Sequence, residues 1–256
     1  MQKEQPYDTT EHYERLASTY DQNWAHSPEY VRWMNGEIAD RLQLTQGERV
    51  ANIGAGTGLF AQKMAEKVGA GRPIVCIDPF QAMLDELPDD PRLRPLCATA
   101  EDIASGKVAL PYDHVDAIVI KETIHHVKGI PETLRGLAGL MAPGGRLLIV
   151  TLPPRLDYPI FQAALERFEA YHPEPDDLER YLRDAGLDAE LSYGEFHVTV
   201  DRDHYINLVG NKWMSVLSTF SDEEMQAGLR EMREQHPEPS LSFTDRFAFV
   251  YGRKPS

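Results

Sequence analysis

Three alternate glycines, Gly54, Gly56 and Gly58, follow a short apolar run that is typical of a buried strand. Glycine lets the backbone turn sharply and approach a ligand closely. The following residues have helical spacing, and the free N–H groups at the start of a helix can bind a polar ligand. Asp78 lies twenty residues beyond Gly58 at the end of the next apolar run, where a carboxylate can accept hydrogen bonds from both ribose hydroxyls. This order of features predicts a nucleoside-binding site.

The spacing of these glycines discriminates between nucleoside ligands. The dinucleotide fingerprint has its third glycine at the fifth position after the first. Here Gly58 stands at the fourth position and Leu59 at the fifth. A nicotinamide dinucleotide (NAD), which would make the protein a dehydrogenase, is therefore the second choice of ligand.

Polar residues gather again after a later apolar run, at the edge where open α/β sheets bind ligands. His126 is a candidate general base, because an imidazole titrates near neutral pH. A structural role beneath the glycine loop is the alternative. His125 is either a second catalytic candidate or a packing residue, and Glu122 either holds a basic nitrogen of the substrate or pairs with Lys121. Their spacing matches no established metal motif, so we expect no metal.

The elements that position these residues alternate between short apolar runs and stretches of helical spacing. The predicted strands are 49–53, 74–77, 93–98, 115–120 and 146–152, and the predicted helices between them are 59–68, 80–87 and 132–141. A turn is expected at 143–145. Strand alternating with helix predicts the α/β class, with a Rossmann-like doubly wound sheet that is mostly parallel.

The remaining segments read as helical cap elements and two closing strands, the last of them antiparallel. We expect a single domain over 1–256. Its parts are a cofactor-binding core over about 45–152, cap elements over about 1–44, 153–186 and 201–236, and closing strands over about 188–200 and 242–251. An aromatic stripe on a helix over 11–24, formed by Tyr13, Tyr20 and Trp24, either covers the ligand or packs in the core. Tyr20 is the favoured ligand contact.

Composition limits the partners. The 256 residues are 42% hydrophobic, enough for one sizeable core. Forty-one acidic against twenty-six basic residues leave a net charge of -15, so neither nucleic acid nor an anionic membrane is an expected partner. Cys76 and Cys97 lie in apolar runs and should be buried, without disulfide or zinc. With no apolar leader or spanning segment, we expect a soluble, cytoplasmic protein that binds a small molecule. The sequence assigns no oligomeric state.

Several motifs together resemble one enzyme family. They are Asn52–Gly58, Asp78-Pro79 with Met83, Ala100-Glu101-Asp102, His126 and Ala142–Gly145. The chain resembles class I S-adenosylmethionine-dependent methyltransferases, and most of all the ubiquinone/menaquinone-biosynthesis-type small-molecule members. The resemblance covers about 13–152 and the two closing strands, whereas the cap matches loosely. It implies that S-adenosyl-L-methionine is the cofactor and that its methyl group passes to a small-molecule acceptor by in-line displacement.

The resemblance also implies which residues hold the cofactor. The glycine loop, Ala55 included, would wrap the methionine part, and Asp78 would bind the ribose. The adenine would lie between Pro79, Phe80 and Met83, with Ala100 and Glu101 at its edge. The backbone at Lys121 would face the methionine amino group, and the N-terminal helix with Tyr20 would cover the site.

Two positions depart from the family pattern. Asn52 stands where the family usually has an acid, although its amide can still accept a hydrogen bond. Thr99 stands where many relatives have an adenine-binding Asp, which would move that role to Glu101 or Asp102. The missing acid leaves open an alternative with the same fold and cofactor, in which the chain catalyses an elimination, cyclisation or isomerisation. The Asn/Asp-Pro-Pro-aromatic motif of nucleic-acid amino-methyltransferases is replaced by 121–124, which again favours a free metabolite.

Overall fold

A seven-stranded sheet with the order β3-β2-β1-β4-β5-β7-β6 forms the centre of the protein. The computed structural model describes residues 10–22 and 27–256, apart from the side chains of residues 10, 11, 19, 20 and 22. The strands are β1 (Val50–Ile53), β2 (Ile74–Asp78), β3 (Leu93–Cys97), β4 (Val115–Lys121), β5 (Met141–Thr151), β6 (Asp188–Asp201) and β7 (Ser240–Arg253). The pairs within β1 to β5 are parallel, and β7 runs antiparallel to both β5 and β6. The predicted fold class is confirmed.

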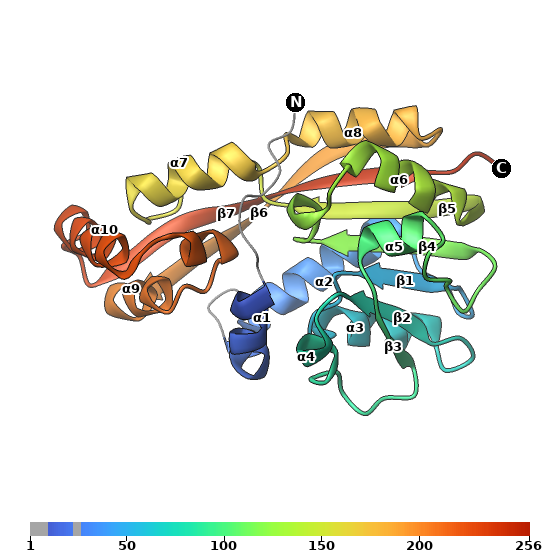
Figure 1. The fold of residues 1–256 in the computed structure, drawn as a ribbon, viewed down its shortest axis with the longest axis horizontal. Coiled ribbons are helices and arrows are strands. Elements are labelled where there is room, and N and C mark those ends of the chain that lie inside the picture. The colour runs from blue at the N-terminus through green and yellow to red at the C-terminus, as the bar shows by residue number, and fades with distance from the viewer. Residues whose placement is uncertain (1–9, 23–26) are drawn as a thin grey trace.

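Helices cover both faces of this sheet (Figure 1). One core cluster joins the sheet to α2 (Pro28–Leu42) and α3 (Leu59–Val68). The other joins it to α5 (Ala100–Ala104), α6 (Ile130–Gly139) and α8 (Pro175–Asp184). Strand β4 shows why both faces need cover, because its buried side chains alternate between the two clusters. A strand buried on both faces reads as a continuous apolar run in the sequence.

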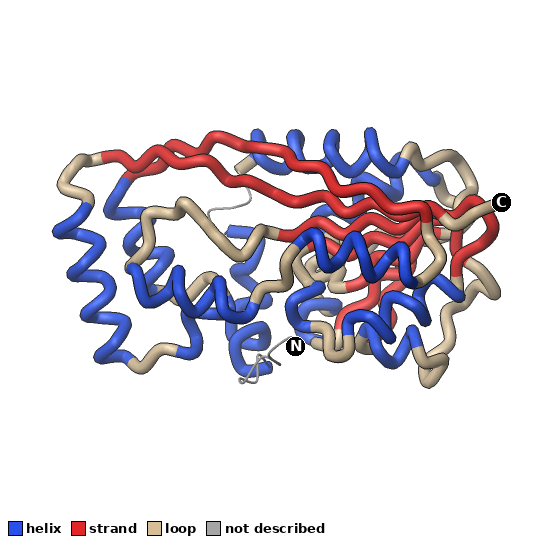
Figure 2. Tube along the Cα trace, turned by 90° about the horizontal axis from the view of Figure 1, so that it is seen from above, coloured by secondary structure: helices blue, strands red, loops and turns tan. Residues whose placement is uncertain are grey.

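The cap gathers around the far end of the long β6–β7 hairpin, away from the parallel strands (Figures 1 and 2). Of the elements expected in the cap, those that lie here are α7 (Gln162–Tyr171), α9 (Arg202–Gly210), η4 (Ser215–Thr219) and α10 (Asp222–Gln235), whereas α2 and α8 cover the sheet. β6 and β7 pair from Asp188 to Asp201, whereas β5 reaches only to the pair Thr151 and Ala248. The outer half of the hairpin therefore continues beyond the carboxyl edge of the parallel strands.

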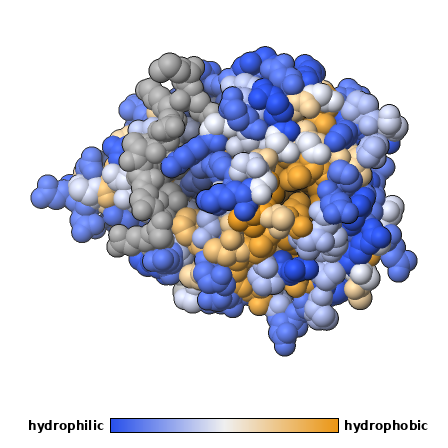
Figure 3. Space-filling model, turned by 45° about the vertical axis from the view of Figure 1, so that its right-hand side comes forward, coloured by the Kyte–Doolittle hydropathy of each residue, from blue (hydrophilic) through white to orange (hydrophobic). Residues whose placement is uncertain are grey.

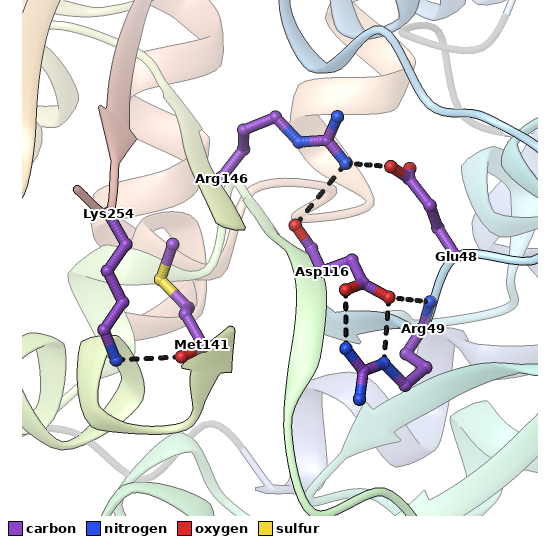
Figure 4. A network of polar contacts seen from close by, with 6 residues as sticks. All are labelled: Glu48, Arg49, Asp116, Met141, Arg146 and Lys254. Atoms are coloured by element: carbon purple, nitrogen blue, oxygen red, sulfur yellow. Dashed lines mark hydrogen bonds and ion pairs between the residues drawn. The ribbon is translucent and has the colours of Figure 1, made fainter. Parts of the chain in front are cut away.

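Hydrogen bonds and ion pairs tie together the opposite, amino-terminal ends of the strands (Figure 4). The guanidinium of Arg49 makes two hydrogen bonds to Asp116, of 2.7 and 2.9 Å, and Arg146 donates to Glu48 at 2.6 Å. Lys254 donates to the carbonyl of Met141 at 2.8 Å. These residues lie directly before β1, in β4 and β5, and directly after β7, so their contacts link the starts of neighbouring strands.

On the face shown in Figure 3, polar residues surround a band of apolar residues. Among the large apolar side chains that the structure describes, Tyr193 is the one classed as exposed, at 42%. The band is therefore made of side chains that remain partly covered by their neighbours. No helix in the described ranges has the length and apolar character needed to cross a bilayer.

The helices near the N-terminus depart from the prediction. The expected helix over 11–24 is α1 (Thr10–Leu16) followed by the tighter η1 (Ala17–Gln22), and Trp24 lies outside the described residues. Ser27 caps α2, since its side chain accepts from the backbone N–H of Tyr30 at 3.1 Å. Tyr30 is the buried residue of the first turn of α2.

Three further local predictions were wrong. Helix α4 covers only Gln81–Leu84, four residues of the expected 80–87. The turn expected at 143–145 lies inside β5, where Gly144 takes a φ of +74° and donates to Lys254 at 3.1 Å. Cys97 is exposed, because it ends β3 at the edge of the sheet, whereas Cys76 is buried as expected.

Candidate functional site

The glycine loop joins β1 to α3 at the carboxyl edge of the sheet. Gly54, Gly56 and Gly58 have φ values of +69°, +55° and +80°, which residues with a Cβ rarely adopt. A Cβ on Gly54 would lie 1.9 Å from Oγ1 of Thr123, and one on Gly58 would lie 2.3 Å from a methyl carbon of Leu87. The loop therefore needs glycine for its backbone conformation and for the close approach of its neighbours.

Asp78 fixes the shape of this loop from the end of β2. Its Oδ2 accepts from the N–H of Gly56 and its Oδ1 from the N–H of Phe80, both at 3.0 Å. The side chain is buried, which raises its pKa, while the two N–H donors oppose that shift. A carboxylate offers about four acceptor positions. Each oxygen of Asp78 therefore keeps the capacity to accept one more donor, such as a ribose hydroxyl.

The residues predicted around the adenine lie in the segments that follow β2 and β3 in the chain. Met83 is buried in α4, and Phe80 is the residue just before that helix. Oγ1 of Thr99 accepts from the N–H of Asp102 at 3.1 Å and so caps α5. Oε1 of Glu101 accepts from the N–H of Lys128 at 2.6 Å. Thr99 and Glu101 thus have structural partners of their own in addition to any role in binding.

Four more of the predicted contacts lie in or directly beside β1, β2 and α5. Asn52 is buried within β1, between β2 and β4. Pro79 directly follows β2, and its carbonyl accepts from Sγ of Cys97 at 3.5 Å. Ala100 is buried in the first turn of α5, and the N–H of Ala55 donates to the carbonyl of Ile77 at 2.9 Å.

The N-terminal helices cover the loop. The ring of Tyr13 stacks on that of Phe80 with their centroids 5.0 Å apart, and its hydroxyl lies 2.8 Å from Nε2 of His126. The hydroxyl of Thr57 donates to Asp21 of η1 at 2.7 Å. The sequence favoured Tyr20 for this covering role, but its side chain lies outside the described residues. Tyr13, from the same aromatic stripe, makes the contacts that the structure describes.

Three histidine rings meet where η3 (Ile124–His126) faces the end of α7. The ring centroid of His125 lies 4.0 Å from that of His126 and 4.3 Å from that of His172. Phe168 stacks on His172 at 3.4 Å. Burial lowers the pKa of His172 to about 3 and those of the other two well below 6.5. All three rings are therefore neutral at pH 7, and Nδ1 of His125 has no hydrogen-bond partner among the described residues.

Lys121 and Glu122 form an ion pair at the end of β4, with Nζ and Oε2 2.5 Å apart. The ammonium also lies 4.5 Å from the ring centroid of Phe60. Glu122 has a φ of +49°, which is uncommon for a residue with a side chain. Of the two predicted roles for Glu122, the structure contains the pairing with Lys121. The unusual backbone turns the chain at the point where β4 leaves the sheet.

Sequence reasoning missed a buried acid on β7. Asp245 is 1% exposed, and the hydroxyl of Tyr158 donates to its Oδ1. The signal was available in part, because Asp245 occupies the same inward phase of the strand as Phe243 and Phe247. Tyr158 lies in an irregular segment after β5 and gave no such signal. His172 was missed for the same reason, as it follows the last turn of α7.

The predicted residues thus meet in two adjoining groups at one edge of the sheet. The first is the glycine loop with Asp78, Phe80 and the covering Tyr13, which has the features of a nucleoside site. The second is η3 with the histidine rings and the Lys121 pair. His126 links the two groups through its hydrogen bond to Tyr13. This arrangement can bind a nucleoside and hold neutral imidazoles beside it.

Comparison with known sequences agrees with this arrangement. The model of a family described as a methyltransferase domain matches residues 51–147. An uncharacterized methyltransferase of Mycobacterium tuberculosis is 35% identical over 118 residues, which are 44% of this chain and 44% of the relative. A ubiquinone/menaquinone biosynthesis C-methyltransferase of Serratia proteamaculans is 28% identical over 128 residues, 49% of each protein. The chain thus aligns with about half the length of these curated relatives.

Solved structures share the fold over most of the chain. A structure from Anabaena variabilis, ascribed to a methyltransferase of an antibiotic biosynthesis pathway, gives a TM-score of 0.67 at 17% identity and covers 86% of this chain and 96% of that one. The [4+2]-cyclase SpnF gives 0.64 at 15% identity, covering 100% and 99%. Such low identities show the fold alone. With the family match, they confirm the resemblance to class I S-adenosylmethionine-dependent methyltransferases.

Proposed function

We propose that this class I methyltransferase transfers the methyl group of S-adenosyl-L-methionine to a small-molecule acceptor by in-line displacement. The observation that carries the proposal is the buried Asp78, which fixes the glycine loop and keeps free acceptor capacity at the carboxyl edge. The family match over residues 51–147 supports it. On this proposal, the core over about 45–152 binds the cofactor, and the cap shapes the acceptor pocket.

The residues present fit this cofactor. Glycine at positions 54 and 58 lets Thr123 and Leu87 pack closely against the loop, and the absence of side chains there is also what a close approach of a ligand to the backbone would require. Asp78 would accept the ribose hydroxyls, and the aromatic face of Phe80 would pack against the adenine. The bound cofactor supplies an electrophilic methyl group on sulfur. The work of the protein is then to orient the acceptor nucleophile and exclude water, and the cover of α1 serves the second purpose.

His126 is the proposed general base. Its ring is neutral at pH 7, which is the form that can take a proton, although the burial that lowers its pKa also makes it a weaker base. Its Nε2 is within hydrogen-bond distance of the Tyr13 hydroxyl, which positions the ring. His126→Gln should lower turnover while cofactor affinity stays near that of the parent. Unchanged turnover would leave His126 with a packing role.

The cofactor assignment is tested by calorimetric titration of the full chain with S-adenosylmethionine and, separately, with NAD. We expect the first to bind and the second not to. Asp78→Ala should weaken S-adenosylmethionine binding by about a hundredfold or more, because the loop loses its anchor and the ribose loses its acceptor. Equal binding by the variant, or preferential binding of NAD, would refute the assignment. The conservative Asp78→Asn variant should fall between the two.

A second candidate function keeps the fold and the cofactor but not the methyl transfer. The neighbour SpnF, described as a [4+2]-cyclase, covers the whole of this chain at a TM-score of 0.64. Asn52, where the family usually has an acid, is consistent with a changed use of the cofactor. The two functions differ in product. Methyl transfer releases one S-adenosylhomocysteine per turnover, whereas a cyclisation, elimination or isomerisation releases none.

A further inference from the structure

Beyond the carboxyl edge of β5, the inward face of β7 carries one acid among aromatic side chains. Asp245 lies in register between Phe243 and Phe247 on this face. The ring of Phe243 has its centroid 5.1 Å from that of Tyr158 and 5.5 Å from that of Tyr205. The side chains come from β7, from the segment after β5 and from α9. The cap and the sheet thus meet at this acid.

The charges around Asp245 do not neutralise it. Lys121 is the cation that acts on its carboxyl, and Glu122 is the anion. Because these two are paired at 2.5 Å, their charges largely cancel, and no described cation lies within ion-pair distance of Asp245. The hydroxyls of Tyr158 and Tyr205 are polar but uncharged. An ionised Asp245 would therefore be a buried anion without a dedicated counter-ion, which is costly in a protein interior.

The pKa of the Asp245 carboxyl reflects its burial and these neighbouring groups. Burial is the main cause that raises the pKa of Asp245 to about 7, and Glu122 raises it further, while Tyr158 and Lys121 lower it. Tyr158 donates to Oδ1 of the acid. Tyr158 is the one hydrogen-bond donor to this carboxyl among the described residues, and a carboxyl has further acceptor positions. The acid therefore keeps capacity for a polar group that a ligand would bring.

We propose that Asp245 and Tyr158 anchor the acceptor, and that they select an apolar, ring-bearing molecule that offers a hydrogen-bond donor, either a hydroxyl or an ammonium group. The aromatic side chains of Phe243, Tyr205 and Tyr158 suit a flat apolar body. A ligand donor would satisfy the acid, whereas a carboxylate or phosphate would meet like charge. This inference rests on the proposed function for the identity of the acceptor site. It concerns recognition, and it assigns no proton transfer to Asp245.

Four matched probes test the anchor: 2-naphthol, 2-naphthylmethylammonium, 2-naphthoate and 2-methoxynaphthalene. They share one ring system and differ in offering a neutral donor, a cationic donor, an anion or no donor. Each is titrated calorimetrically at pH 7 into the full chain, with and without saturating S-adenosylhomocysteine. We expect one or both donor probes to bind at least about tenfold more tightly than naphthoate and the ether. The difference in affinity between 2-naphthol and 2-naphthylmethylammonium distinguishes an acceptor that bears a hydroxyl from one that bears an amine.

Variants then assign the preference to the anchor. Asp245→Asn should reduce the preference for the donor probes to within about threefold, and Tyr158→Phe should weaken it independently. Tyr193→Phe, at an exposed ring, is the control and should leave it intact. Equal affinities for all four probes, no binding of any, or an unchanged preference in both anchor variants would overturn the proposal. S-adenosylhomocysteine affinity is read in the same series, so a failure of the cofactor assignment is seen separately.

Discussion

The two ends of the parallel strands treat their polar groups in opposite ways. At the amino ends, Asp116 and Glu48 each accept from an arginine, in an arrangement that links three strands (Figure 4). At the carboxyl ends, Asp78 is held by backbone N–H groups alone, and Nδ1 of His125 has no partner among the described residues. At the amino end these acids are paired with arginines. At the carboxyl end Asp78 keeps acceptor capacity beside a loop of three glycines with positive φ, as expected where ligands bind.

The largest expected effect comes from filling the glycine loop. Gly54→Ala places a Cβ 1.9 Å from Thr123 at a φ of +69°. It should cost about 2–4 kcal/mol of the free energy of unfolding and weaken S-adenosylmethionine binding by about a hundredfold. Gly144→Ala is the matched control at the amino end, with a φ of +74° but its nearest neighbour 3.9 Å away. It should cost only about 1 kcal/mol and spare binding.

Urea unfolding and calorimetric titration of both glycine variants check this difference. If Gly54→Ala and Gly144→Ala lose equal stability and retain equal cofactor affinity, the crowding at the carboxyl edge has no functional meaning. The comparison would then reduce to the common cost of placing alanine at positive φ.

A smaller effect is expected from opening the amino-end network. Arg49→Met removes the two hydrogen bonds from the guanidinium to Asp116. The side chains of Arg49 and Asp116 are 26% and 25% exposed. The free energy of unfolding should fall by about 1–2 kcal/mol, reduced by solvent at this partly exposed pair. S-adenosylmethionine affinity should not change. Arg155→Met, which breaks a pair with an 84% exposed arginine, should leave the free energy of unfolding unchanged within experimental error. A loss of affinity in Arg49→Met would show that the two ends are coupled.

The subtlest test uses pH. His172 has its pKa lowered to about 3, so its contribution to stability is complete above pH 6.5 and is lost as the pH falls towards 3. The hydrogen bond from Arg49 lowers the pKa of Asp116, so the contribution of this pair to the free energy of unfolding is complete above the ordinary pKa of 3.8 and is lost only below it. On acidification, the interactions at the carboxyl end should therefore be lost before those at the amino end.

Urea unfolding between pH 4 and pH 7 measures this order. His172→Gln should flatten the fall in stability over that window, whereas Arg49→Met should leave its slope unchanged. Equal slopes in the parent and in His172→Gln would mean that the histidine does not carry the acid sensitivity.

Features that depend on residues close together in the chain were predictable from the sequence. Helix α3 has the bounds that its periodicity predicted. The glycine loop and Asp78 belong to one strand–helix–strand unit, so their approach also followed from short-range order.

The remaining site contacts join residues that are far apart in the chain. Tyr13 reaches His126 across 113 positions, and Tyr158 reaches Asp245 across 87. No local pattern encodes such pairs, because they depend on how the cap folds back over the sheet. The exposure of Cys97 was missed for a related reason. Its strand is apolar enough to read as central, and only the strand order places it at the edge.

The position of β7 sets an order of assembly. Strand β6 has β7 as its one neighbour in the sheet, and residues 202–239 separate the two along the chain. Until β7 pairs with β5, β6 has no place in the sheet, and such long-range pairing is slow to form. The same strand delivers Asp245. A refolding chain should therefore complete its nucleoside pocket, built from residues 50–126, before the end of the site where the acceptor is recognised.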